Sequence, residues 1–210
     1  MSEHSKIFET HYQNYCRQIQ AIDLDAIKKR LNIQVKNNIA HVRLFDQTYQ
    51  VSGRGIFDEA NKKADYVTCV ILSKYLLNCP DQSYLDADWC TFRDFKKESH
   101  FTNANFFNSD TTRKIIDFFS GRLIELKTAA EHIQGVNEQT DLAYDLSFSF
   151  TALPRLSLLL LVNEADDDFP ADCKVLFQRQ GEYYLDPESL AMTSGLLAQK
   201  LIRADETKGD

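Results

Sequence analysis

Apolar residues recur every three or four positions in several parts of the chain, a spacing that is typical of amphipathic helices. The expected helices cover about residues 6–19, 24–31, 63–78, 111–133 and 187–203. The helix at 63–78 is apolar on almost every side, so we expect it at the centre of the fold. Asp23 and Asp186 suit the N-cap position of two of these helices, and Pro187 suits the first helical position after Asp186.

Other segments have the alternating or continuous apolar pattern of strands. Residues 33–35, 39–45 and 48–52 are separated by short polar turns and predict a three-stranded antiparallel meander. Residues 156–162 lack polar alternation, so we expect an inner strand that is covered on both faces. The remaining expected strands cover residues 89–92, 144–150, 173–178 and 183–185, with the turn Gln180-Gly181 between the last two.

These elements predict an α+β fold in which antiparallel strand groups surround a central apolar helix with further helices on the flanks. The chain contains no internal repeat and no linker rich in proline, glycine or serine. We therefore expect one domain over residues 1–204, followed by a frayed acidic tail at 205–210.

Composition excludes several classes of protein. The chain has 210 residues, 43% of them hydrophobic, which is normal for a folded domain. The longest apolar run, residues 153–162, is too short to cross a membrane, and the first residues lack the pattern of a secretion signal. The five cysteines show no close pairing, so we expect reduced, mostly buried thiols in a cytoplasmic protein.

The negative charge is concentrated in the second half. Residues 1–105 carry 14 basic and 13 acidic side chains, whereas residues 106–210 carry 10 and 18. An acidic half opposes binding to nucleic acid, so we expect no nucleic-acid partner. The sequence permits a homo-oligomer and contains nothing that specifies one.

Two short motifs resemble binding sites but favour simpler interpretations. Gly53-Arg54-Gly55 lacks the further residues of a phosphate loop and predicts a turn. The acidic run at residues 163–168 lacks the glycine and glutamate positions of a calcium loop, so we interpret it as a hydrated turn. No standard hydrolase, kinase or zinc-protease motif occurs, and the sequence predicts no cofactor and no metal site.

The most unusual segment is residues 86–95, which contains the only tryptophan, Trp89, together with Phe92, Arg93 and Asp94. Aromatic side chains around an arginine suit a small pocket for an anionic or planar ligand. The alternative is an aromatic core strand in which Arg93 pairs with a nearby carboxylate, and this alternative is favoured because aromatic residues dominate cores.

Several pieces of the chain resemble a bacterial and archaeal family known as domain of unknown function 3786. The matching pieces, in chain order, are Tyr75-Leu76, Trp89-x-Thr91-Phe92-Arg93-Asp94, Leu153-Pro154-Arg155, Asp168-Phe169-Pro170-Ala171, Val175-Leu176-Phe177 and Tyr184-Leu185. The resemblance extends over about residues 25–203. It implies a cytoplasmic protein, commonly of anaerobes, from a family without an assigned reaction.

Some members of that family carry an attached iron–sulfur domain, but this chain lacks the required cysteines. Family members also tend to have a proline or glycine turn after the arginine–acid pair, whereas Lys96-Lys97-Glu98 stands at that place here.

The leading functional hypothesis is a non-catalytic module that binds a small ligand or acts as an accessory protein. Its polar site would combine Trp89, Phe92, Arg93 and Asp94 with Arg155, and Asp168 would lie at the rim. An unpaired charge beside apolar strands is costly, which is why the two arginines suggest an anionic partner. One alternative is a hydrolase or transferase that uses Asp94 and His100 as acid–base groups, and another is a protein–protein interaction module.

Overall fold

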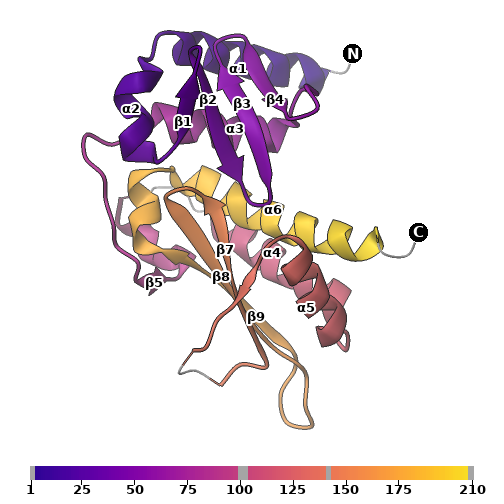
Figure 1. The fold of residues 1–210 in the computed structure, drawn as a ribbon. Helices are drawn as coiled ribbons and strands as arrows, with labels where there is room; N and C mark the ends of the chain where they lie inside the picture. The colour runs from indigo at the N-terminus through magenta and orange to yellow at the C-terminus, as the bar shows by residue number, and fades with distance from the viewer. Residues whose placement is uncertain (1–2, 99–103, 141–142, 208–210) are drawn as a thin grey trace.

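The computed structural model describes residues 3–98, 104–140 and 143–207 and has an α+β fold (Figure 1). Two antiparallel sheets lie among the helices, and the second of them includes one strand, residues 89–90, from the first half of the chain. The helices are α1 (Glu3–Gln20), α2 (Leu24–Leu31), α3 (Tyr66–Leu77), α4 (Ala104–Phe119), α5 (Leu123–His132) and α6 (Pro187–Glu206), with 3₁₀ helices η1 (Phe92–Glu98) and η2 (Arg179–Tyr183). The strands are β1 (Gln34–Lys36), β2 (Ile39–Leu44), β3 (Gln47–Ser52), β4 (Gly55–Asp58), β5 (Trp89–Cys90), β6 (Val136–Asn137), β7 (Leu146–Leu153), β8 (Leu156–Asn163) and β9 (Asp172–Gln178).

The first sheet is a meander in the order β1-β2-β3-β4. The three predicted strands are confirmed, and Asn37 and Asn38 form the first turn with φ values of 51° and 58°. Strand β4 is an addition that the sequence did not predict, because Ile56 and Phe57 alone make too short an apolar run. The turn between β3 and β4 consists of Gly53 and Arg54, which confirms the turn interpretation of the glycine motif.

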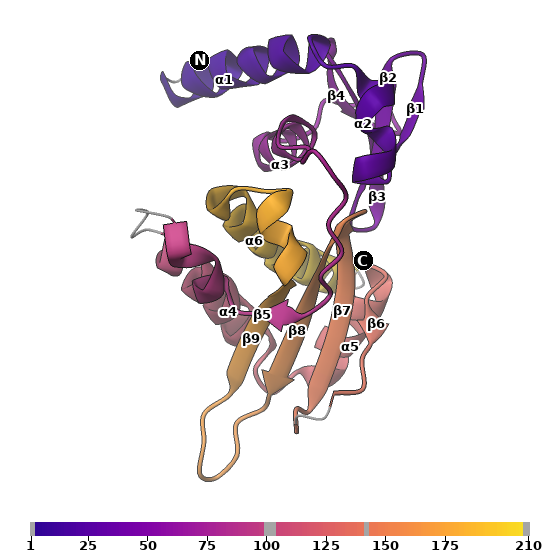
Figure 2. The same ribbon diagram turned by 90° about the vertical axis from the view of Figure 1, so that its left-hand side faces the viewer.

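Helix α3 lies at the centre of the fold, as its apolar composition predicts. It begins after Asp65, whose side chain accepts a hydrogen bond from the Thr68 backbone at 2.9 Å. Figure 2 shows α3 between α1 and α6, and its side chains from Thr68 to Leu76 are buried with the exception of Lys74. A helix that packs on several sides needs this uniform apolarity.

The second sheet has the order β5-β9-β8-β7-β6. Helices α4, α5 and α6 lie on one of its faces (Figures 1 and 2). Strand β8 is the middle strand, and Leu158, Leu159, Leu160 and Leu161 are all buried although neighbouring residues point to opposite faces. The prediction of an inner strand covered on both faces is therefore confirmed.

The single helix predicted at 111–133 is wrong. Helix α4 ends at Phe119 and α5 begins at Leu123, with Gly121 between them in the left-handed conformation at φ 71°. The apolar spacing continues across this break, because Ile115, Phe119 and Leu126 are all buried. Periodicity alone therefore does not reveal the interruption.

The strand predicted at 183–185 is also wrong. Residues 179–183 form η2, and the backbone N–H groups of Tyr184 and Leu185 both donate to the Gly181 carbonyl. The following helix begins as predicted, because the Asp186 side chain accepts a hydrogen bond from the Ser189 N–H at 2.8 Å.

Helix α6 extends to Glu206, beyond the predicted end near 203. Arg122 donates a 2.6 Å hydrogen bond to Asp205, which lies in the region expected to fray. Residues 208–210 of the expected tail lie outside the described residues.

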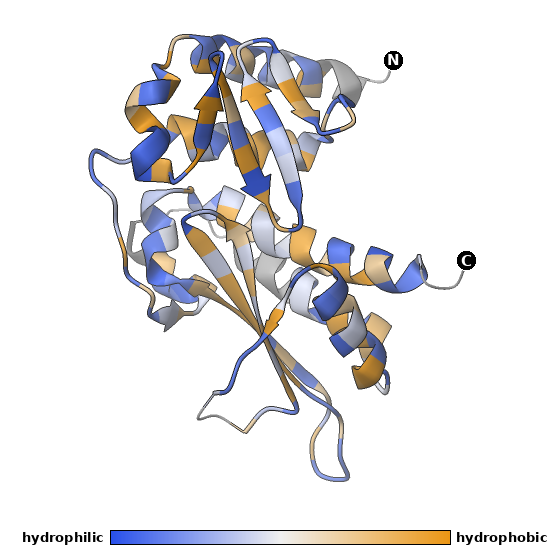
Figure 3. Cartoon of the chain, in the orientation of Figure 1, coloured by the Kyte–Doolittle hydropathy of each residue, from blue (hydrophilic) through white to orange (hydrophobic). Residues whose placement is uncertain are grey.

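One cluster of buried apolar side chains extends through both halves of the chain. Figure 3 shows apolar residues concentrated where the helices and sheets face one another, whereas the loops at the lower end of the second sheet are mostly polar. The two sheets meet where the Phe45 N–H donates to the Ala152 carbonyl at 2.9 Å. None of the helices in the described ranges combines the length and the apolar composition needed to span a membrane.

Candidate functional site

Arg155 lies in the turn between β7 and β8 and joins the two halves of the chain. Its guanidinium donates hydrogen bonds to the carbonyls of Arg30 at 3.0 Å and Lys29 at 3.1 Å, at the C-terminal end of α2. The Tyr75 hydroxyl donates to the adjacent Leu31 carbonyl at 2.7 Å. The last carbonyls of a helix lack partners within the helix and carry partial negative charge. Arg155 thus acts as a helix cap supplied by the other half of the molecule.

The Trp89–Asp94 segment contains residues with quite different surroundings. Phe92 is 1% exposed and packs against Phe95 and Phe177, with ring centroids 6.4 and 5.9 Å away. Arg93 is exposed, and Trp89 is 36% exposed at the edge of the second sheet. The segment therefore divides into a core residue and surface residues.

Asp94 closes the turn that follows β5. Its carboxylate accepts hydrogen bonds from the Thr91 N–H at 2.7 Å and from the Thr91 hydroxyl at 2.8 Å. Both contacts are local, so Asp94 stabilises the start of η1. His100 lies outside the described residues, so the predicted Asp94–His100 pair stays a prediction.

Gln180 connects the segment before Trp89 to the turn that contains Arg155. Its side chain accepts a hydrogen bond from the Asp86 N–H at 2.7 Å and donates to the Arg155 carbonyl at 2.8 Å. The side chain is buried, with 6% exposure. The sequence predicts only a turn at Gln180, because a single glutamine carries no motif. The Gln180 side chain thus links the turn of Arg155 to Asp86, three residues before Trp89. The Arg93 and Arg155 side chains have different surroundings.

Asp168 lies at the other end of the second sheet, in the loop between β8 and β9. It is exposed, and its N–H donates to the Asp166 side chain at 2.9 Å. Because β8 runs its full length between Arg155 and this loop, the structure does not bring Asp168 to the other predicted residues.

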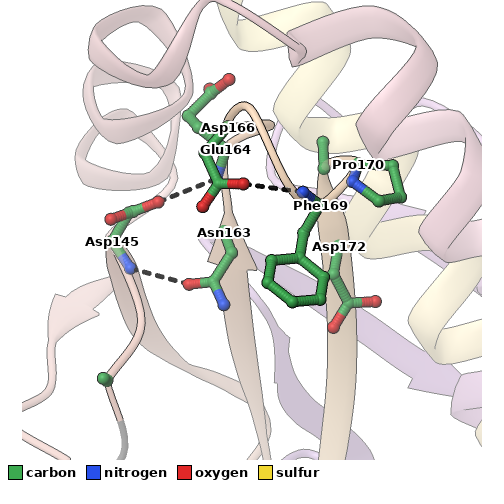
Figure 4. A pocket seen from close by; sticks show the side chains of 9 residues that line it. Asp145, Asn163, Glu164, Asp166, Phe169, Pro170 and Asp172 are labelled. Carbon is green, nitrogen blue, oxygen red and sulfur yellow. Dashed lines mark hydrogen bonds between the residues drawn. The ribbon is translucent and has the colours of Figure 1, made fainter.

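The loop that contains Asp168 borders a cavity of about 570 Å³ (Figure 4). Three segments supply its walls: the approach to β7, the end of β8 with its following loop, and the start of β9. The lining residues are Ala143, Asp145, Asn163, Glu164, Asp166, Phe169, Pro170, Ala171 and Asp172. We name this feature the acidic cavity, since four of these side chains are carboxylates.

Hydrogen bonds to the backbone hold three of the four carboxylates. Asp145 accepts from the Glu164 N–H at 2.8 Å, Glu164 accepts from the Gly121 N–H at 2.8 Å, and Asp166 accepts from the Phe169 N–H at 2.7 Å. Asp172 has an ion-pair distance of 3.7 Å to Lys174. Such fixed partners orient the carboxylates before any ligand arrives.

An aromatic ring accompanies these charges. Phe169 is 70% exposed, and in Figure 4 its ring lies between the side chains of Asn163 and Asp172. The acidic run at 163–168 is visible in the sequence, but the contribution of Asp145 and Asp172 is not. Strand pairing would have identified these two residues. The Asp145 N–H bonds to the Asn163 side chain at 3.1 Å, and Asp172 lies opposite Asn163 in the sheet.

A second cavity of about 400 Å³ lies where α2 meets β1. Its lining includes Lys28, Lys29 and Lys36, and Arg155 contacts the Lys29 carbonyl beside it. Lys28 also forms a 2.6 Å ion pair with Asp25. This groove is basic, in contrast to the acidic cavity.

The cysteines are free thiols, and burial raises the pKa of all five. The pKa reaches about 11 for Cys90 and about 12 for Cys69 and Cys173. A thiol attacks as a thiolate, so these groups are weak nucleophiles at neutral pH. Across the described ranges, no three carboxylate, histidine or cysteine side chains are arranged to hold a metal ion.

Comparison with known proteins agrees with the resemblance seen in the sequence. No curated protein and no solved structure matches the chain. A family model described as Domain of unknown function (DUF3786) matches residues 23–200, from the start of α2 into α6. Since this match covers far more than half of its length, the chain belongs to the family of domain of unknown function 3786.

Proposed function

We propose that this chain is a non-catalytic binding module whose acidic cavity holds a small organic cation. The observation that carries the proposal is that Asp145, Glu164, Asp166 and Asp172 line one cavity together with the exposed ring of Phe169. Ligand cavities typically combine apolar surface with a few polar groups that fix orientation.

The chemistry of the lining favours an ammonium or guanidinium group. Carboxylates accept charge-assisted hydrogen bonds from such groups, and an aromatic face attracts a cation. A metal ion is less suited, because the described carboxylates do not form a metal-binding arrangement. The ligand would place its charge among the carboxylates and its apolar part against Phe169.

The predicted anionic ligand is a second candidate, at a different place. The basic groove of Lys28, Lys29 and Lys36 beside Arg155 is the feature that favours it. Trp89, Phe92, Arg93 and Asp94 do not line this groove, so their predicted role as ligand contacts rests on the sequence alone.

We also propose a cytoplasmic location. Five free cysteines support it, because proteins of oxidising compartments usually pair their thiols.

Calorimetric titration of the full chain with arginine methyl ester and with 1,5-diaminopentane tests the cation site. We expect saturable binding that weakens as salt rises, because part of the attraction is electrostatic. Phe169→Ala and Asp172→Asn should each weaken binding by about three- to tenfold, the range of a cation–π contact or a partly exposed ion pair.

Matched controls lie on α5. Ile124→Ala removes an apolar side chain that is 79% exposed, and Glu125→Gln removes an exposed charge. Both should leave binding unchanged. If neither cation binds, or if the control variants weaken binding as much as the cavity variants do, the proposal is wrong.

A further inference from the structure

The first sheet has one covered face and one open face. Helices α1 and α3 lie on one side of it, and within the described ranges no helix or strand covers the other side (Figure 2). The side chains of Ala40, Val42 and Val51 are fully buried, so they point toward the helices. Side chains along a strand alternate between the two faces of a sheet, so the residues between these three point outward.

Strand register identifies the outward side chains, because residues directly opposite each other in neighbouring strands share a face. Gln34, His41 and Gln50 lie opposite one another across β1, β2 and β3. The outward side chains, which we name the open face, are Gln34, Lys36, Ile39, His41, Arg43, Thr48, Gln50, Ser52 and Phe57. None of them is a carboxylate.

This part of the molecule is a basic region in an acidic chain. Residues 24–58, from α2 to the end of β4, carry six lysine or arginine side chains and three aspartates, whereas the whole chain has a net charge of −7. The aspartates have partners of their own, namely Lys28 for Asp25, Lys200 for Asp46 and the Lys62 N–H for Asp58. The open face therefore attracts anionic groups, and charge complementarity of this kind selects partners.

Two exposed cations lie far apart on the open face. Arg43 is held in place, because its Nε donates to the Phe45 carbonyl at 2.6 Å and its guanidinium also bonds to the Gln134 side chain. Lys36 lies opposite Ile39, and Ile39 is four residues from Arg43, about 13 Å along β2 at 3.3 Å per residue. A single small anion cannot contact both cations, whereas an extended peptide with carboxylates four residues apart can.

Neutral hydrogen-bonding groups fill the space between the two cations. His41 lies between them on β2, with Gln34 and Gln50 on either side. Amide and imidazole groups can both donate and accept, so they suit the backbone of an extended chain. Single-stranded nucleic acid is less suited, because it binds by stacking on aromatic rings and Phe57 is the only phenylalanine, tyrosine or tryptophan of the open face.

We propose that the open face binds an extended acidic segment of a partner protein. The segment lies along β2 with carboxylates four residues apart, one at Lys36 and one at Arg43, and its backbone bonds to Gln34 and Gln50. This inference goes beyond the proposed function and does not depend on it, because the acidic cavity lies in the other sheet and repels an acidic segment.

The probe is a peptide with blocked ends and glutamates at its first and fifth residues, separated by serine and threonine. It is titrated into the ¹⁵N-labelled full chain. We expect saturable shifts at the His41 and Gln50 amides, no shifts at Glu164 and Phe169, and weaker binding as salt rises. A peptide of the same composition with adjacent glutamates should bind at least threefold more weakly, and a peptide with glutamines in their place should not bind.

Variants test the site itself. Lys36→Glu should weaken binding about tenfold and Gln50→Val about threefold, since the first replaces attraction by repulsion and the second removes a hydrogen bond. Lys127→Glu, at an exposed lysine of α5, changes the net charge by the same amount as Lys36→Glu and should leave binding unchanged.

Lys29→Gln, in the basic groove, should change binding less than twofold. Equal effects of Lys36→Glu and Lys127→Glu would overturn the proposal, as would equal binding of the adjacent-glutamate peptide, a larger effect of Lys29→Gln than of Gln50→Val, or tighter binding of a thymidine oligonucleotide to this face.

Discussion

The two ends of the second sheet use polar residues in opposite ways. At the end near α2, the Arg155 and Gln180 side chains bond to backbone groups of distant segments. At the other end, the carboxylates around the acidic cavity also accept hydrogen bonds from backbone N–H groups, but these bonds are exposed and the side chains line open space. In the sequence the two ends look alike, because Arg155 and the acidic run at 163–168 are both charged residues beside an apolar strand.

This contrast indicates where function is to be sought. A polar side chain that bonds to partly buried backbone groups of another segment stabilises the fold, because its removal leaves those groups without this partner. A surface carboxylate contributes little to stability and is available to a ligand. Stability should therefore depend on the α2 end, and cation binding on the cavity end.

The largest effect should follow Arg155→Ala. This change removes two hydrogen bonds to the carbonyls of Lys29 and Arg30 and should lower the free energy of unfolding by about 2–3 kcal/mol. Urea denaturation measures it. Arg93→Ala, at an exposed arginine, is the control and should cost less than about 0.5 kcal/mol. Equal losses in the two variants would contradict the role of Arg155 as a helix cap.

Gln180→Ala should have the next largest effect, about 2 kcal/mol, because the Asp86 N–H and the Arg155 carbonyl both lose a partner. It should also shift Trp89 emission to longer wavelength as β5 loosens. Gln18→Ala, at an exposed glutamine of α1, is the control and should cost less than about 0.5 kcal/mol and leave the emission unchanged. Unchanged Trp89 emission in Gln180→Ala would show that the hydrogen bond from the Asp86 N–H to Gln180 is not needed to hold β5 in place.

Asp186→Ala should cost about 1 kcal/mol through loss of the N-cap of α6, plus the contribution of its 3.0 Å ion pair with Lys74. Asp186→Asn keeps the cap and loses only the ion pair. Burial alone would raise the pKa of Asp186, but hydrogen bonds from Ser189 and Lys74 outweigh it and keep the pKa below the usual value.

A lowered pKa in the folded state means that the charged form stabilises the fold above the unfolded pKa of about 4. The stability difference between wild type and Asp186→Asn should therefore be constant near neutral pH and decrease as the pH falls below about 4. Denaturation curves at several pH values measure this. A difference that grows toward acid would have the wrong sign.

The smallest effect should follow Asp172→Asn at the cavity. The side chain is 53% exposed and only 3.7 Å from Lys174, so stability should change by less than about 0.5 kcal/mol while cation binding weakens. A large loss of stability without loss of binding would show that Asp172 has a structural role, like Arg155 and Gln180 at the α2 end, and would contradict its role in binding.

The sequence predicts those parts of the fold that local chemistry determines. The caps at Asp23 and Asp186, the first meander and the central helix are confirmed. Predictions are wrong where distant contacts decide the structure. The break at Gly121 coincides with its N–H bonding to Glu164, 43 residues away. Residues 183–185 form no strand, and the Tyr184 hydroxyl bonds instead to the Tyr84 backbone, 100 residues away.

The candidate site shows the same division. The acidic run after β8 is visible in the sequence, but its combination with Asp145 and Asp172 depends on how β7 and β9 pair with β8. Arg155 was identified as a charge that needs a partner. That partner is a set of backbone carbonyls, which no side-chain pattern can indicate.

The central claim is that the acidic cavity binds an organic cation, and NMR titration of the ¹⁵N-labelled chain with arginine methyl ester tests it most directly. The backbone amides of Gly121, Glu164 and Phe169 donate to cavity carboxylates and report on them. We predict saturable shifts at these amides, little change at Gln180, and weaker binding in Phe169→Ala. Shifts that do not saturate, or that persist unchanged in Phe169→Ala, would contradict the claim.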